Sequence, residues 1–135
     1  METKNNHFLS LIIPVYKQEK TIVKNIKSIT TALNQIRYPY EVIVVIDGIV
    51  DKSLSNIKRA KILHVKTHAY VKNQGKSYAI RLGMTRAKGD YVMFLDSGSE
   101  IDPNGISMLL EHMEWYKADI IVGSKRHPAS YVKYP

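Results

Sequence analysis

The sequence of 135 residues contains no cysteine, and none of its apolar runs is longer than about eight residues. The absence of cysteine excludes a disulfide scaffold, a Cys-ligated zinc or iron–sulfur centre and a thiol nucleophile. Apolar runs of this length are too short for a membrane-spanning helix, and we expect no signal peptide because Met1–His7 is polar. We therefore expect one domain, residues 1–135, in a reducing compartment such as the cytoplasm.

Carboxylates are also missing from residues 52–89, which carry ten of the 20 lysines and arginines. Residues 90–119 reverse the sign, with seven acidic side chains against one lysine. The formal charge of +8 is therefore separated into blocks along the chain. Solvated surface lysines explain a basic chain in general, whereas separate blocks indicate an anionic ligand bound between them.

Apolar periodicity alternates between short continuous runs and helical stripes, which predicts alternating strands and helices. The predicted strands are 8–15, 41–46, 61–65, 91–95 and 119–123. The predicted helices cover 22–36 and about 50–59, then a segment from Gly75 to Gly89 with Ala79, Ile80, Gly83, Met84 and Ala87 inward, and a last one starting at Asp102. This order predicts an α/β protein, a three-layer α/β/α Rossmann-like fold with a mostly parallel sheet of about five strands.

Ligands of parallel sheets bind beyond the carboxyl ends of the strands, so polar segments that follow strands are candidate sites. These segments are 16–19, 47–51, 96–102 and 124–127. Asp47 can accept hydrogen bonds from a base or ribose, or it can simply form an Asp-Gly turn with Asp51 capping the next helix. Asp96 ends an apolar strand, and Glu100 and Asp102 follow it. Such oxygen donors suit Mg²⁺ or Mn²⁺, although Asp102 fits a helix N-cap equally well.

The segment Asn73-Gln74-Gly75-Lys76 precedes a predicted helix. Helix N-termini next to a glycine bind phosphate through free backbone N–H groups, which makes Lys76 a candidate ligand. The spacing of the glycines differs from that of a P-loop. Farther along the same helix, Arg81, Arg86 and Lys88 are expected on its solvated face.

Several of these segments form a known pattern when they are taken in order. The first half contributes Leu11–Tyr16 (LIIPVY), Glu19, and Val44–Gly48 (VVIDG) followed by Asp51 and Ser53. The second half contributes Asn73-Gln74-Gly75-Lys76, Gly83, Ala87–Tyr91 (AKGDY) and Phe94-Leu95-Asp96. Over about residues 8–127 the pattern resembles the N-terminal half of family 2 glycosyltransferases with the GT-A fold. The ending Ala118–Pro128 resembles the branch that transfers sugars to polyprenyl phosphates, which includes dolichol-phosphate mannose synthases.

The resemblance implies an inverting transferase with a nucleoside-diphosphate sugar as donor and a polyprenyl phosphate as expected acceptor. By position it implies a nucleotide-sugar site made of Pro14, Tyr16, Glu19, Asp47, Lys76 and Asp96. Asp96 matches the first aspartate of the family's DxD motif, which binds the metal-diphosphate. Ile46 stands where the family has the first of two aspartates after the second strand.

The metal site implied by the resemblance departs from the family pattern. Gly98 replaces the second aspartate of DxD and has no side chain that can ligate a metal. Glu100 is the ligand that we expect beside Asp96, with Asp102 as the other candidate, for a Mg²⁺ or Mn²⁺ ion. In the polyprenyl-phosphate branch a basic residue after the fifth strand holds the acceptor phosphate, a role that falls here to Lys125 or Arg126.

Family members need a further segment after the fifth strand, so we expect this chain to be an incomplete half of a transferase, and it offers no identifiable catalytic base. Two other functions remain open. A non-catalytic nucleotide-sugar-binding or regulatory module is favoured by Gly98. A nucleic-acid-binding protein is favoured by the charge of +8 and opposed by the acidic block 90–119. For a transferase we expect the basic block to face an anionic membrane at its cytoplasmic side.

Overall fold

The computed structural model describes residues 8–36, 38–95, 105, 108, 120–124 and 127–134. Four of the predicted site residues lie outside this set: Asp96, Glu100, Lys125 and Arg126. The described elements are β1 (Leu9–Val15), α1 (Ile22–Leu33), β2 (Tyr40–Asp47), α2 (Ser53–Ala60), β3 (Val65–Tyr70), α3 (Lys76–Arg86), β4 (Tyr91–Phe94), β5 (Ile120–Ser124) and β6 (His127–Tyr134).

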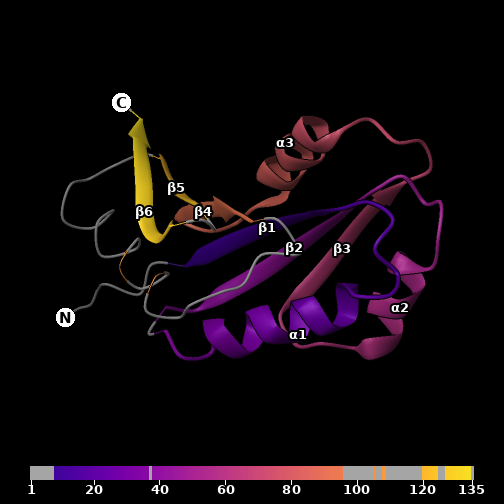
Figure 1. Ribbon diagram of the computed structural model, residues 1–135, viewed down its shortest axis with the longest axis horizontal. Coiled ribbons are helices and arrows are strands. Elements are labelled where there is room, and N and C mark those ends of the chain that lie inside the picture. The colour runs from indigo at the N-terminus through magenta and orange to yellow at the C-terminus, as the bar shows by residue number, and fades with distance from the viewer. Residues whose placement is uncertain are drawn as a thin grey trace.

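Strands β1 to β4 form one parallel sheet in the order β3-β2-β1-β4. Helices α1 and α2 cover one face of this sheet and α3 covers the other (Figure 1). The sheet is parallel because each pair of consecutive strands is joined by a helix that returns the chain to the starting edge. The predicted three-layer α/β/α arrangement is confirmed.

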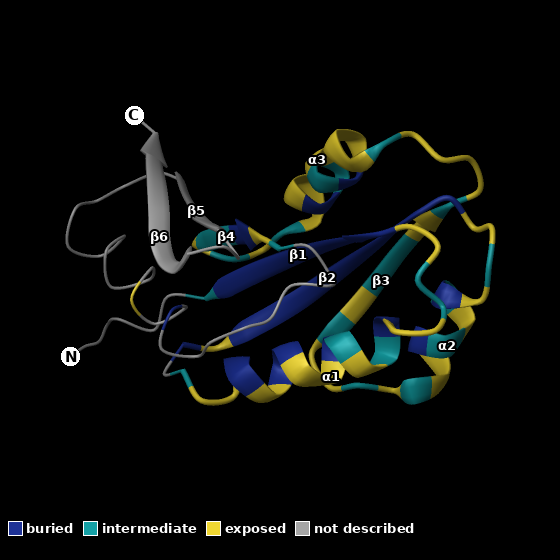
Figure 2. Ribbon diagram, viewed as in Figure 1, coloured by how far each residue is buried: buried dark blue, intermediate teal, exposed yellow. Residues whose placement is uncertain are grey.

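The two central strands are buried along their whole length (Figure 2). Alternate side chains of a strand point to opposite faces, so β1 and β2 supply both layers of the core. On one face they pack against the apolar stripe of α1, which consists of Ile22, Ile26, Ile29 and Leu33. On the other face a smaller cluster forms around Ile12, Ile43, Val45 and Ala79. The continuous apolar runs therefore mark strands between two helical layers.

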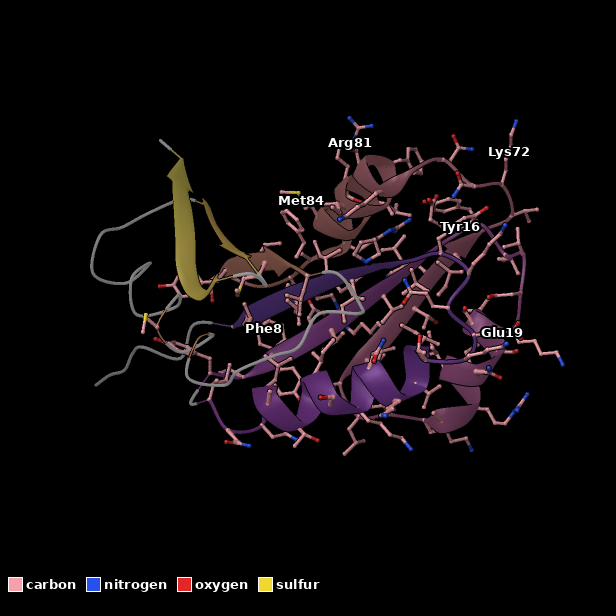
Figure 3. All side chains as sticks on the ribbon, viewed as in Figure 1. Phe8, Tyr16, Glu19, Lys72, Arg81 and Met84 are labelled. Carbon is pink, nitrogen blue, oxygen red and sulfur yellow. The ribbon has the colours of Figure 1, made fainter. Side chains whose placement is uncertain are left out.

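Helix α3 lies close to β1 because small residues face the sheet. A Cβ atom at Gly83 would lie 2.5 Å from Cγ2 of Ile12, so only glycine fits there. Ala79 is fully buried, and both residues face inward as predicted. Met84 is 49% exposed, which contradicts its predicted inward position. The helix approaches the sheet along a narrow strip of small side chains, and Met84 lies outside that strip (Figure 3).

The third strand lies farther along the chain than predicted, at Val65–Tyr70 and not at 61–65. Lys61 and His64 have φ angles of 50° and 68°, a left-handed conformation that a strand does not allow. Strand β3 is an edge strand with one neighbour, and its polar sequence VKTHAY carries little of the apolar signal that marks a buried strand.

The fifth predicted strand, 119–123, is present as β5 but does not join the parallel sheet. It pairs antiparallel with β6 in a separate two-stranded sheet. We did not predict β6. Only two residues separate β5 from β6, and strands that are close in sequence pair antiparallel, since a parallel pair needs a crossover of about a dozen residues or more.

The last predicted helix, starting at Asp102, falls mostly outside the described residues, although Gly105 and Met108 are helical. Among the helices that the structure describes, none combines the length and the apolar character needed to cross a membrane.

Candidate functional site

Three loops meet at the carboxyl edge of the parallel sheet, where ligands of such sheets bind. They are residues 16–21 after β1, 48–52 after β2 and 71–75 after β3. Tyr16, Glu19 and Lys72 mark this edge in Figure 3, whereas Phe8 lies at the opposite end of β1. The predicted site residues that the structure describes all belong to this edge or to the strand and helix ends that border it.

The first two loops are tied together by reciprocal hydrogen bonds. The backbone N–H of Glu19 donates to Oδ2 of Asp51 (3.2 Å), and the N–H of Lys52 donates to Oε1 of Glu19 (2.9 Å). Asp51 also accepts from the N–H of Ser53, the first residue of α2 (2.9 Å), a bond to the residue two positions on; the N-cap of α2 is Lys52, so Asp51 is not the capping residue that the sequence allowed. Burial raises the pKa of Asp51, but the hydrogen bonds from Ser53 and Glu19 and the charge of Lys17 together lower it by more, so its pKa lies below the usual value.

An open cleft of about 370 Å³ lies between these two loops, lined by residues 17–21 with Val50 and Asp51. Its volume lies within the range of small-molecule sites, about 300–1,000 Å³. A larger hollow, of about 450 Å³, lies at the amino end of the sheet beside Tyr40 and His64. The hollow lies at the wrong end of the strands for a ligand of a parallel sheet, so the cleft at the carboxyl edge is the better candidate.

Lys17 lines the cleft, and Tyr16 directly precedes it in the chain; both side chains are exposed. The Tyr16 ring is 41% exposed, and Nζ of Lys17 lies 5.2 Å from its centroid. Lys17 adopts a φ of 53°, so the chain turns sharply directly after Tyr16. An exposed ring next to a cation is suited to stacking on a flat ligand that carries negative charge.

Pro14 is buried within β1 and has a structural explanation. The carbonyl of Ile12 accepts from the N–H of Leu95 (2.9 Å), so the polar groups of Ile12 face β4. By the two-residue period of a strand, Pro14 faces the same side, and the pairing between β1 and β4 ends at Ile12. Its missing N–H therefore costs no hydrogen bond in the sheet. The predicted contact of Pro14 with a nucleotide stays a prediction.

Asp47, at the end of β2, is 3% exposed and binds the loop that follows β3. Its Oδ1 accepts from the Tyr70 hydroxyl (2.6 Å) and the Gln74 N–H (2.8 Å), and its Oδ2 accepts from Nδ2 of Asn73 (2.8 Å) and the Gly75 N–H (3.0 Å). A carboxylate has about four lone-pair sites, and these four donors fill them. Asp47 therefore positions residues 73–75 and the start of α3; its direct contact with a base or ribose stays a prediction.

The turn after Asp47 requires glycine. Gly48 has a φ of 101°, and a Cβ atom there would lie 3.1 Å from the backbone nitrogen of Asn73. This confirms the Asp-Gly turn that the sequence allowed. Gly75, also at 101°, precedes Lys76, which is exposed as the first residue of α3.

Sequence reasoning missed the part played by Tyr70. Burial, followed by the hydrogen bond to Asp47 and its negative charge, raises the pKa of the Tyr70 hydroxyl. Its ring meets the ring of Tyr78 edge to face, with centroids 5.3 Å apart. Placing the third strand at 61–65 left Tyr70 in a loop, so the only available signal, a tyrosine just before Asn73-Gln74-Gly75, was not used.

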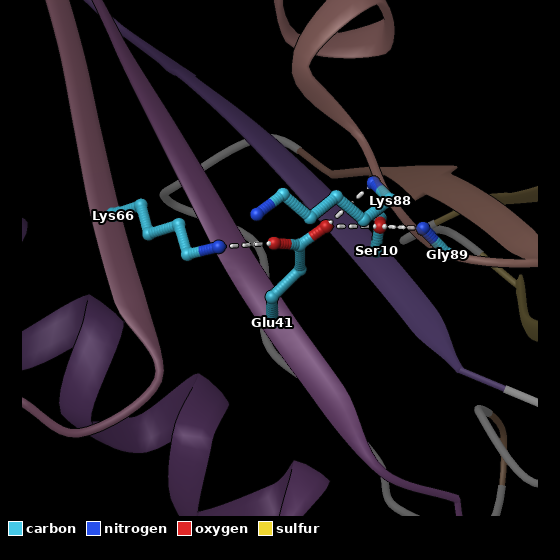
Figure 4. A network of polar contacts seen from close by, with 5 residues as sticks. All are labelled: Ser10, Glu41, Lys66, Lys88 and Gly89. Atoms are coloured by element: carbon cyan, nitrogen blue, oxygen red, sulfur yellow. Dashed lines mark hydrogen bonds and ion pairs between the residues drawn. The ribbon is translucent and has the colours of Figure 1, made fainter.

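A second buried carboxylate, Glu41, lies at the amino end of β2, and its partners show that it is structural (Figure 4). Its Oε2 accepts from the Ser10 hydroxyl (2.6 Å) and the Lys88 N–H (2.8 Å), and its Oε1 accepts from Nζ of Lys66 (3.0 Å). Burial raises the pKa of Glu41, but these hydrogen bonds and the charge of Lys66 together lower it by more, so its pKa lies below the usual value. The network joins β1, β2 and β3 to the connection after α3.

Gly89 belongs to this network. The sequence had suggested that Gly89 ends α3, and this prediction is wrong. The helix ends at Arg86, and Ala87 is already extended. The N–H of Gly89 donates to Oγ of Ser10 (2.8 Å), and a Cβ atom at Gly89 would lie 2.6 Å from the carbonyl oxygen of Phe8. Glycine is required here for close packing against the start of β1.

The predicted metal ligands, Asp96 and Glu100, are not among the described residues. Within the described ranges, no group of three or more His, Cys, Asp or Glu side chains can hold a metal ion. The described carboxylates of the carboxyl edge, Glu19, Asp47 and Asp51, each accept a hydrogen bond from the protein. A metal at this edge would depend on the carboxylates that follow β4 in the sequence.

Comparison with known proteins agrees with this architecture. Residues 10–130 match the family described as Glycosyl transferase family 2. The chain is 29% identical over 133 residues to the undecaprenyl-phosphate 4-deoxy-4-formamido-L-arabinose transferase of Pseudomonas fluorescens, a match that covers 96% of this chain and 39% of that protein. It therefore spans about two fifths of the length of this relative.

Two solved structures resemble the fold. The mannosyltransferase PcManGT from Pyrobaculum calidifontis, in complex with GDP-Man and Mn²⁺, has a TM-score of 0.67 and 20% identity over 78% of this chain and 32% of its own. S. aureus TarS 1-349, in complex with UDP-GlcNAc, has a TM-score of 0.67 and 24% identity over 82% of this chain and 32% of its own. These likenesses confirm the GT-A fold. With the family match over most of its length, the chain belongs to glycosyltransferase family 2.

Proposed function

We propose that the carboxyl edge of the sheet binds a nucleoside-diphosphate sugar and that the chain is the donor-binding part of a glycosyltransferase. The observation that carries this proposal is the cleft between the loops after β1 and β2, which the bonds between Glu19, Asp51 and Lys52 hold in shape. Membership of the family supports the proposal, as do the two similar structures, which are complexes with GDP-Man and with UDP-GlcNAc.

Three residues in or next to the cleft are assigned to the nucleoside: Tyr16, Lys17 and Glu19. The exposed ring of Tyr16 stacks on the base, and Lys17 beside it adds positive charge. Oε1 of Glu19 accepts a hydrogen bond from the N–H of Lys52, whereas Oε2 accepts none from the described residues. That oxygen accepts from a ribose hydroxyl, a bond strengthened by the charge of the carboxylate.

The diphosphate is assigned to the start of α3 and to the segment after β4. Asp47 fixes residues 73–75, and Lys76 follows them at the carboxyl edge as the exposed first residue of α3, where it adds positive charge. Asp96 and Glu100 supply the oxygen donors for a Mg²⁺ or Mn²⁺ ion, which when bound neutralises charge on the departing diphosphate. The Mn²⁺ in the PcManGT complex supports such an ion.

The acceptor is assigned to a polyprenyl phosphate, the class named for the undecaprenyl-phosphate relative. Lys125 or Arg126 holds its phosphate. One phosphate oxygen attacks the anomeric carbon and forms a new carbon–oxygen bond, while the bond to the nucleoside diphosphate breaks with inversion. A phosphate is already anionic near neutral pH, so the reaction needs no general base from the protein.

Thermal unfolding in the presence of nucleotides tests the donor site. Titration with UDP-GlcNAc and GDP-mannose, each with and without Mn²⁺, should raise the unfolding temperature for at least one of them, because a ligand that binds only the native state stabilises it. The change should saturate and should exceed that given by the free sugar. If neither nucleotide sugar nor UDP nor GDP raises the unfolding temperature, the proposed donor site is wrong.

A further inference from the structure

Three apolar side chains are exposed together at the carboxyl edge, and we call them the apolar tip: Ile49, Val50 and Val71. They are 42%, 52% and 77% exposed. The N–H of Ile49 donates to the carbonyl oxygens of Tyr70 (3.1 Å) and Val71 (3.2 Å), which brings the loops after β2 and β3 side by side. Single exposed apolar residues are ordinary, but three that adjoin on two loops form a small apolar surface.

Four exposed lysines surround the apolar tip, and we call them the basic rim: Lys17, Lys20, Lys52 and Lys72. Lys17 and Lys20 line the same cleft as Val50. Lys52 and Lys72 lie within two residues of the tip in the sequence, and Lys72 points outward from the edge in Figure 3.

The carboxylates near this surface offset only part of the charge of the rim, which has four lysines against Glu19 and Asp51. Glu19 and Asp51 are only partly exposed, and both accept hydrogen bonds from backbone N–H groups. The whole segment 52–89 contains no acidic residue. The combination of apolar side chains with lysines around them matches the chemistry of a bilayer surface, where apolar groups enter the acyl boundary and lysines contact anionic headgroups.

We infer that the apolar tip and the basic rim dock the chain on a bilayer that contains anionic phospholipid. Electrostatic complementarity selects this partner, since anionic headgroups would balance the excess of lysines over carboxylates at this edge, which a neutral surface would not. The inference rests on the proposed function in one respect: docking through this edge brings the cleft to the surface from which a lipid phosphate would be taken. It is independent of which nucleotide binds.

Sedimentation with vesicles tests the inference. The 135-residue chain should bind vesicles of phosphatidylcholine and phosphatidylglycerol in the absence of nucleotide, and bind phosphatidylcholine alone much less. The variant V71S/K72Q removes one apolar group and one charge from the patch. It should lower the affinity at least about threefold, since one lysine near an anionic surface is worth about that factor or more.

The chain offers a closely matched control. Leu63 is 78% exposed, against 77% for Val71, and Lys58 is exposed in the last turn of α2. Both residues lie away from the carboxyl edge, so L63S/K58Q also removes one exposed apolar group and one positive charge. The control should bind the anionic vesicles like the unchanged chain, and both variants should unfold at the same temperature. Equal binding to both vesicle types, or an equal loss in both variants, overturns the inference. Nucleotide-induced stabilisation, measured without vesicles, should survive in V71S/K72Q, so failure of the donor site would be seen separately.

Discussion

The carboxylate of Asp47 organises the loop before α3, because four donor groups of residues 70–75 converge on its two oxygens. The group is almost fully buried and its bonds to these donors are partly buried, so removing the carboxylate would cost several hydrogen bonds at once. Asp47 therefore supports the candidate site by holding Lys76 in place. Among the described residues of the carboxyl edge, Glu19 retains an oxygen that is available to a ligand.

Replacing Asp47 by asparagine should destabilise the fold. The amide has one acceptor oxygen and brings an NH₂ group against donors, so we expect a loss of about 2–4 kcal/mol in the free energy of unfolding. Urea unfolding monitored by circular dichroism measures it. Asp90→Asn is the control, because Asp90 is exposed and asparagine keeps an oxygen for the Phe8 N–H that Asp90 binds at 2.9 Å; its loss should stay below about 1 kcal/mol. Similar losses of unfolding free energy in the two variants would contradict the structural role of Asp47.

Glu41 should make the stability depend on acid. Its pKa is depressed in the folded state, so the ionised carboxylate contributes stability above its ordinary pKa of 4.5, and that contribution is lost as the pH falls through the lower folded value. The difference in unfolding free energy between the unchanged chain and Glu41→Gln should therefore be large at pH 7 and shrink below about pH 4.5. Asp51, whose pKa is also lowered, contributes equally to the pH dependence of both proteins, so its contribution cancels in the difference. A difference that does not change with pH would contradict the assignment.

At the scale of elements, the contact between α3 and β1 depends on Gly83. Alanine there gains helix propensity of about 1 kcal/mol but places a methyl group 2.5 Å from Cγ2 of Ile12. Because Ile12 is fully buried in a central strand, overpacking should outweigh the gain, and Gly83→Ala should lower the unfolding free energy by about 1–3 kcal/mol. Chemical denaturation measures the change. Ser77→Ala, at an exposed position of α3, is the control, and a Gly83→Ala protein as stable as this control would contradict the packing.

The elements that could be predicted from the sequence are those with a strong apolar pattern. β1, β2 and α1 are buried on the faces that their periodicity indicated, because buried strands and amphipathic helices need those patterns. β3 was misplaced because an edge strand can be polar. The pairing of β5 with β6 depends on contacts between strands, which the sequence of each strand does not specify.

The candidate site was predicted in part for a related reason. The loops after β1 and β2 do lie at one edge, because parallel topology brings the ends of strands together. The partners of Asp47 could not be predicted, since its bonds to Asn73 and Gly75 join residues more than twenty positions apart. The roles proposed for Asp96, Glu100, Lys125 and Arg126 concern residues outside those that the structure describes.

At the scale of the whole molecule, part of the positive charge of this +8 chain gathers at the carboxyl edge. The lysines of the basic rim and Lys76 lie there, while at the amino end of the sheet the half-exposed Lys66 pairs with the buried Glu41. This polarity fits an anionic donor and an anionic surface at one end of the molecule. It gives less support to a nucleic-acid-binding protein, since family 2 membership already accounts for an anionic ligand.

Calorimetric titration of a nucleotide sugar into Glu19→Gln tests the central claim most directly. Glutamine keeps a carbonyl oxygen for the N–H of Lys52, so the loops stay joined, but it loses the charged oxygen proposed for the ribose. The account predicts about tenfold weaker binding than in the unchanged chain, the cost of a charge-assisted hydrogen bond. Asp90→Asn, with the same change of charge away from the cleft, should bind within about twofold of the unchanged chain. Equal affinity in Glu19→Gln and the unchanged chain would contradict the account.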